Sequence, residues 1–113
     1  MSRDLSKGDI PSLILAVLSD GPCHGYAIAR EVERRSQEIF RLREGSLYPA
    51  LRVLEQDGLI EGQWEEQTSG PARKVYLLTS AGCVELSKKA REWALYREAI
   101  NRFIGGKTHA PAA

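Results

Sequence analysis

The sequence predicts a small α+β domain that is mainly helical, and three observations lead to this prediction. Three apolar segments with helical periodicity come first. Two short stretches of strand-like residues follow them, separated by a polar turn. A longer amphipathic segment then precedes a short tail rich in Gly, Pro and Ala. For a chain of 113 residues we therefore expect one compact unit of three helices, a β-hairpin and a long last helix.

The first two helices are predicted from their apolar faces. Apolar residues between positions 10 and 18 recur at intervals of three and four, which predicts a helix with Asp9 at its N-cap. Pro11 falls in the first turn of this helix, where its missing N–H costs nothing. After a Gly-Pro turn, a second helix is expected from about residue 24 to residue 36, followed by a connector over 37–44.

The third helix has the clearest boundaries, because Pro49 cannot lie deep inside a helix. The helix is therefore expected to begin near Ser46. Gly58 suits the left-handed position just after the helix, and Leu59 then supplies the apolar residue of a Schellman-type end. The inward face is expected to carry Leu47, Ala50, Leu51 and Leu54.

The hairpin is predicted from a change of period to two. Strands are expected at 59–64 and 74–78, with a long polar tip between them, and Thr79 or Ser80 then caps a helix over about 81–104. Three helices followed by a hairpin is the order of a winged helix-turn-helix. We divide the chain into that domain at 1–79, a last helix at 80–104 and a tail at 105–113 that is expected to be disordered.

Composition restricts the classes of protein to consider. No apolar run approaches the ~20 residues of a membrane span, and no signal-peptide block precedes residue 8. A cytoplasmic protein without a membrane partner is expected. Cys23 and Cys83 are expected to be reduced thiols. Cys23 and His24 lack metal-ligand spacing and a third orienting group, so no metal, cofactor or catalytic site is expected.

The outward face of the third helix carries groups that suit the major groove of DNA. Arg52 and Gln56 are one turn apart and can reach base edges. Ser46 and Tyr48 suit phosphate contacts near the positive end of the helix dipole, and Pro49 lies on the same side. An ordinary exposed helix is the alternative, and the two acidic residues near the end of this segment favour it.

The hairpin supplies a second group of cations. Arg73 and Lys74 follow a stiff Gly70-Pro71 turn, and cations beside a protruding hairpin suit a minor groove or its flanking phosphates. The formal net charge of +1 is low for a protein that binds nucleic acid. The prediction of DNA binding therefore depends on where the charges lie in the fold.

The last helix is predicted to form a dimer. Leu86, Trp93 and Ile100 are spaced by seven residues, as are Tyr96 and Phe103, and together they form a seam like that of a coiled coil. So small a domain cannot cover these side chains by itself, so pairing with a second copy is expected. A last helix that folds back over its own domain is the alternative.

These residues resemble the PadR family of transcriptional regulators. The resemblance covers about residues 8–82, and its main segments are 21–28, 45–51 and 73–79. The Gly-Ser-Leu-Tyr-Pro-Ala-Leu run at 45–51 is the most specific of these. The single short C-terminal helix is similar to the compact branch of the family.

The resemblance implies a dimeric, repressor-type regulator of a palindromic operator, with double-stranded DNA and a second copy as partners. Some family members bind planar aromatic effectors through an aromatic residue of the last helix. The resemblance therefore makes Trp93 the candidate contact for a small aromatic effector. Trp93 is also expected to lie in the core of the dimer. Arg52 stands where the family often has His, so a changed base preference is expected. The family's DNA contacts would carry over to Ser46, Tyr48, Pro49, Arg52, Arg73 and Lys74.

Two other functions stay open from the sequence. A winged helix that binds protein and no DNA is favoured a little by the near-neutral charge and by Glu65 and Glu66 beside the hairpin tip. A thiol-based redox sensor would respond to oxidation of Cys23 or Cys83.

Overall fold

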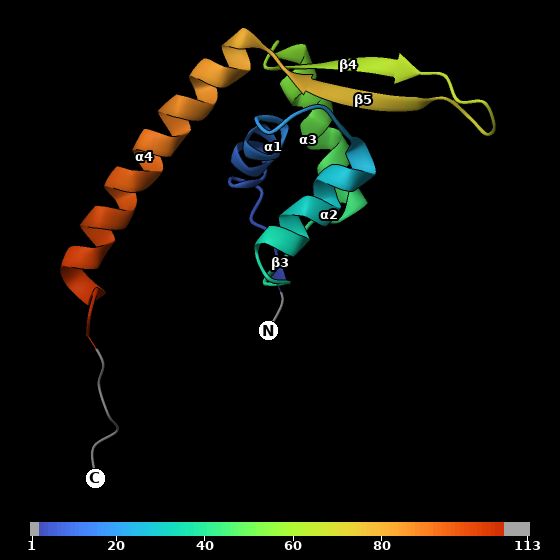
Figure 1. Cartoon of the computed structure of the whole chain (residues 1–113). Helices are drawn as coiled ribbons and strands as arrows, with labels where there is room; N and C mark the ends of the chain where they lie inside the picture. Colours follow the sequence, from blue (N-terminus) through green and yellow to red (C-terminus); the bar gives the residue numbers. More distant parts are fainter. Residues whose placement is uncertain (1–2, 108–113) are drawn as a thin grey trace.

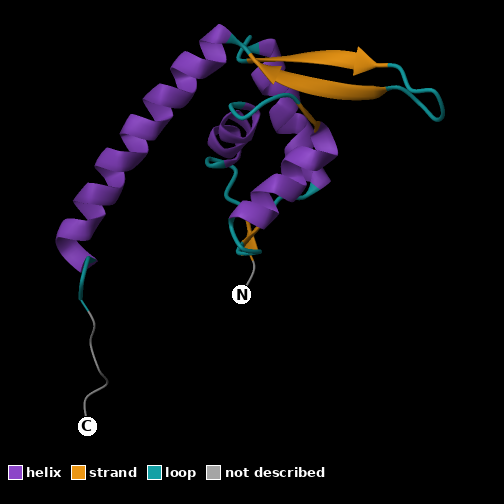
Figure 2. Ribbon diagram, viewed as in Figure 1, coloured by secondary structure: helices purple, strands orange, loops and turns teal. Residues whose placement is uncertain are grey.

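The computed structural model describes residues 3–107 and confirms the predicted α+β winged helix-turn-helix (Figure 1). A short strand precedes each of the first three helices, two longer strands follow α3, and the last helix is by far the longest element (Figure 2). The helices are α1 (Ile10–Leu18), α2 (Gly25–Arg35), α3 (Glu44–Gln56) and α4 (Ser80–Ile104). The strands are β1 (Arg3–Asp4), β2 (Cys23–His24), β3 (Phe40–Arg41), β4 (Ile60–Glu65) and β5 (Arg73–Leu78).

One apolar core joins the first three helices to the sheet. The helical repeat of 3.6 residues brings the apolar positions of α1, α2 and α3 onto single faces that pack together. Burying each large side chain removes apolar surface from water and contributes about 1.5–3 kcal/mol. The side chains with almost no exposed surface are Ile14, Leu15, Ile28, Leu47, Leu51 and Ile60.

The bounds of α3 differ from the prediction at one end. The helix begins at Glu44, two residues before the expected start at Ser46, so Pro49 lies in its second turn. Pro49 deprives the Gly45 carbonyl of its helical partner, but Gly45 is exposed and water can bond to that oxygen. The far end is as predicted: Gly58 has a φ of 75°. A Schellman pattern closes it, with Leu59 N–H donating to the Leu54 carbonyl at 3.0 Å.

The wing is a hairpin of β4 and β5, paired antiparallel from Ile60–Leu78 at its base to Glu65–Arg73 near its tip. The structure adds two pairings that the sequence did not indicate. Strand β2 pairs with β5, which attaches the wing to the start of α2. Strands β1 and β3 form a separate parallel pair. Two-residue strands contain no repeat of period two, so sequence patterns cannot detect them.

The start of α4 is fixed against the end of α3 and the base of the wing. Of the two predicted caps, Thr79 is the one observed: its Oγ1 accepts a hydrogen bond from Gly82 N–H at 3.0 Å and donates to the Gly58 carbonyl at 2.7 Å. A side chain at Gly82 would collide with the Leu59 carbonyl. Beyond this anchor α4 runs away from the domain, and the wing projects from the opposite side (Figure 1).

The structure bears on two predictions, the absence of a membrane span and the disordered tail. Within residues 3–107, no helix combines the length and apolar character needed to cross a bilayer. Residues 108–113 of the predicted disordered tail lie outside the described residues.

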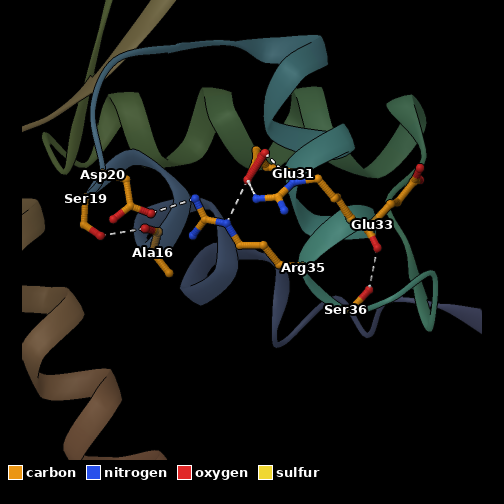
Figure 3. Close-up of polar contacts among 8 residues, drawn as sticks. Ala16, Ser19, Asp20, Glu31, Glu33, Arg35 and Ser36 are labelled. Carbon is orange, nitrogen blue, oxygen red and sulfur yellow. Dashed lines mark hydrogen bonds and ion pairs between the residues drawn. The ribbon is translucent and has the colours of Figure 1, made fainter.

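A polar network fixes α2 to the end of α1 (Figure 3). Arg35 lies between Asp20 at 2.7 Å and Glu31 at 2.8 Å, and Arg34 bonds to the same Glu31 at 2.9 Å. The hydrogen bonds from Arg34 and then Arg35 lower the pKa of Glu31 to about 2. Carboxylates therefore neutralise both arginines, whereas Arg30 on the same helix forms no ion pair within residues 3–107.

Candidate DNA interface

The exposed face of α3 brings together three of the predicted contact residues. Pro49, Arg52 and Gln56 are all exposed on it. The helical repeat places them opposite Leu47 and Leu51, which have at most 1% of their surface exposed. The apolar face of α3 thus fixes the helix to the domain and leaves two long hydrogen-bonding side chains free to reach outward.

Ser46 and Tyr48 lie on the two flanks of this face. Ser46 is half-buried and lines a groove of about 560 Å³ between α3, the start of α1 and α4. Tyr48 points to the other side, where it packs over Gly25 at the start of α2. A Cβ at Gly25 would lie 3.0 Å from the Tyr48 ring, so glycine permits this close approach. The two residues expected to contact phosphate therefore point in different directions.

A cleft of about 610 Å³ opens beside Tyr48, between α3, the start of α2 and the wing. Its lining is aromatic and basic, which is a combination suited to a sugar–phosphate strand. Five rings, from His24, Tyr26, Tyr48, Trp64 and Tyr76, line the cleft together with Arg73 and Lys74.

Lys74 is half-buried at the wing, and its side chain reaches back to α3. Its Nζ lies 3.0 Å from Glu55 Oε1 on α3, and it sits 5.7 Å from the Trp64 ring and 5.4 Å from the Tyr76 ring. The hydrogen bond to Glu55 raises the pKa of Lys74. A side chain at Gly62 would collide with the Lys74 stem, so this glycine makes room for the ion pair. The ion pair with Lys74 offsets the charge of Glu55, one of the two acidic residues near the end of α3.

Arg73 makes a contact that the sequence analysis missed. Its Nη1 donates a hydrogen bond to Tyr26 Oη at 3.1 Å, and its Cζ lies 5.7 Å from the centre of the Tyr26 ring. Arg30 approaches the same ring, with Cζ at 5.5 Å. The sequence signal was the spacing of four between Tyr26 and Arg30, which places both on one face of α2.

The two cysteines lie outside this cleft. Burial, and then the nearby Glu31 carboxylate, raise the pKa of the Cys23 thiol, while Arg35 lowers it by less. A raised pKa reduces the thiolate fraction on which oxidation and nucleophilic attack depend. The neighbouring His24 lies 3.2 Å from Glu65 Oε1. Neither the pKa of Cys23 nor the contact of His24 favours a thiol sensor or a Cys–His nucleophile.

The seam of α4 is divided between the domain and solvent. Leu86 packs against the core, and Trp93 borders an apolar groove of about 320 Å³ between α4 and α1. Trp93, Tyr96 and Phe103 have 58%, 60% and 73% of their surface exposed, and Ile100 has 39%. The same face of the helix is therefore covered near its start and uncovered further along.

The match to a known family decides the class of protein. Residues 14–88, which run from the second half of α1 through α2, α3 and the wing into the start of α4, match the family described as the transcriptional regulator PadR-like family. The chain belongs to the PadR family. Members of this family bind DNA, generally as dimers.

Individual transcriptional regulators are similar to this chain over most of its length. The transcriptional regulator Rv3488 of Mycobacterium tuberculosis is 31% identical over 107 residues, which cover 95% of this chain and 94% of that protein. A PadR family transcription regulator from Clostridium difficile is 38% identical, with a TM-score of 0.77 over 87% of this chain and 100% of that one. A transcriptional regulator from Clostridium thermocellum has a TM-score of 0.80 at 31% identity, covering 87% and 95% of the two chains.

If Lys74 contacts DNA, the carboxylate of Glu55 should compete with a backbone phosphate for its ammonium. We expect Glu55→Gln to raise affinity for any duplex about 3- to 8-fold and to steepen its salt dependence, because the freed ammonium can neutralise one phosphate per protomer. Fluorescence anisotropy at several salt concentrations measures both quantities. Glu61→Gln is the matched control, since Glu61 is an exposed wing carboxylate outside this ion pair. Equal effects of the two substitutions would contradict the competition.

Proposed function

We propose that this chain is a repressor that binds a palindromic operator as a homodimer, with α3 in the major groove. One observation carries the proposal: the exposed face of α3 presents Arg52 and Gln56 on a helix whose other face is fixed in the core. Arg can bond bidentately to guanine and Gln to adenine, so the pair can distinguish base sequences. Arg73 on the wing supplies a contact to the flanking backbone.

The homodimer is supported by the apolar stripe along α4. Near the start of the helix, Leu86 of this stripe packs against the core. From Trp93 onwards the side chains of the stripe are exposed in the single chain. A second α4 covers the uncovered part if the two copies are related by two-fold symmetry. The symmetry of such a dimer would match a palindromic operator, because each α3 then meets an identical half-site.

A small aromatic effector would act where α4 meets α1. Trp93 borders the apolar groove there, beside Leu86 and Phe40. A planar molecule stacked on Trp93 would change the angle between α4 and the winged helix. That change would alter the distance between the two α3 helices of a dimer, and with it the fit to two half-sites.

The proposal is tested by titrating purified protein against duplex DNA from upstream of its own gene, with a random duplex of equal length as the control. Anisotropy at several salt concentrations should show selective binding with two protomers per site and an affinity that falls steeply with salt. Weak binding without preference would lead to a selection from random sequences. A protein that enriches no sequence and shows no salt dependence is a protein-interaction module, and the proposal is then wrong.

A further inference from the structure

Two arginines converge on one tyrosine ring between α3 and the wing. The Cζ atoms of Arg30 and Arg73 lie 5.5 Å and 5.7 Å from the centre of the Tyr26 ring, and Arg73 Nη1 donates to Tyr26 Oη at 3.1 Å. Within residues 3–107, neither arginine forms an ion pair with a carboxylate. Glu65, the cross-strand neighbour of Arg73, instead contacts His24 at 3.2 Å.

The cluster has the chemistry of a phosphate site. Two guanidinium groups close to one ring leave a local excess of positive charge, which a neutral ring offsets only in part. Each guanidinium offers planar pairs of donors that match the oxygens of a phosphodiester. The Tyr26 oxygen already accepts from Arg73, so its own proton is directed elsewhere and can be donated to an anion. Three donor groups, two from α2 and one from β5, thus gather at the Tyr26 ring.

The position of the cluster in the fold indicates which part of the DNA backbone would supply the phosphate. A sugar–phosphate strand forms the wall between a major groove and the adjacent minor groove, so a protein with one element in each groove straddles that strand. In this fold the elements are α3 and the wing, and the cleft lined by Tyr26 and Arg73 lies between them. We propose that Arg30, Tyr26 and Arg73 form a clamp on a backbone phosphate of the straddled strand. This inference rests on the proposed DNA binding.

Arg30→Ala tests the clamp in the full-length protein, because Arg30 is exposed and its loss leaves the core intact. Near about 0.1 M salt we expect affinity to fall roughly 5- to 10-fold per protomer on operator and random duplexes alike, with a salt slope shallower by roughly 0.9 per protomer. Tyr26→Phe keeps the ring and removes the hydroxyl, so a smaller loss of about 2- to 5-fold is expected.

Arg34→Ala is the matched control. It removes the same charge from the same face of α2 one turn further along, where the arginine is paired with Glu31. Affinity should stay near that of the unsubstituted protein. Equal losses in the two arginine variants would overturn the clamp in favour of a general effect of net charge, and so would an Arg30→Ala variant that binds DNA normally.

Two further results distinguish DNA phosphate from free phosphate as the ligand, and the clamp from the proposed DNA binding. Calorimetric titration with inorganic phosphate should show at most weak binding. Tight phosphate binding that Arg30→Ala abolishes, with DNA binding unchanged, would assign the site to free phosphate and overturn the clamp. If the unsubstituted protein binds no duplex at all, the proposed function fails and the clamp with it, whereas a normal affinity in Arg30→Ala removes the clamp alone.

Discussion

Replacing Phe103 with glutamate should dissociate the protein into monomers and lower its affinity for a two-half-site operator by about 10²- to 10⁴-fold. Phe103 has 73% of its surface exposed in the single chain, on the stripe that includes Trp93 and Ile100. In a dimer this stripe is buried, and a carboxylate there would lose its hydration without gaining a partner. Each monomer would then bind one half-site alone. The high effective concentration that a dimer gives to its second half-site contact would be lost.

Sedimentation velocity measures the oligomeric state, and anisotropy on the same samples measures the affinity. Val84→Glu is the matched control: Val84 has 71% of its surface exposed but lies on the opposite side of α4 from Trp93 and Ile100, as the helical repeat requires. It should remain dimeric and bind normally. If dimers persist in both Phe103→Glu and Ile100→Glu, the stripe is not the interface.

Much of the fold could be predicted because it follows from local properties of the chain. The spacing of apolar residues determined α1 at its observed bounds, and Gly58 and Thr79 marked the end of α3 and the start of α4. Each of these signals acts over a few residues, through helix periodicity, a left-handed backbone or a capping hydrogen bond. The start of α3 was placed two residues late because the sequence does not show that an exposed first turn tolerates Pro49.

The chemistry of the candidate interface was predictable in part. Exposure of Arg52 and Gln56 followed from the buried positions of α3. The partner of Lys74 did not, because Glu55 lies 19 residues earlier and reaches it only across the folded sheet. The contact between Arg73 and Tyr26 joins residues 47 positions apart. Such pairs depend on how helices and strands that are distant in the sequence pack against each other. Local patterns in one sequence do not indicate that packing.

Replacing Arg52 with alanine should remove discrimination at one base pair of each half-site. A bidentate contact from arginine to guanine contributes about 1–3 kcal/mol of discrimination. A dimer makes the contact twice, so operator binding should weaken by about 2–6 kcal/mol in total. Random duplexes should lose only the general attraction of the missing charge. Competition of operators mutated at each position against the parent operator measures where discrimination is lost.

Arg52→Lys separates base contact from charge. Lysine keeps the attraction to phosphate but lacks the planar pair of donors, so affinity for random DNA should persist while the preference for one base declines. Because Arg52 is exposed and forms no ion pair within residues 3–107, neither substitution disturbs the fold. An unchanged ratio of operator to random affinity in Arg52→Ala would mean that α3 enters the groove by another face. The flank of α3 that carries Ser46 and Val53 would then have to face the bases, and the wing would be turned away from the minor groove.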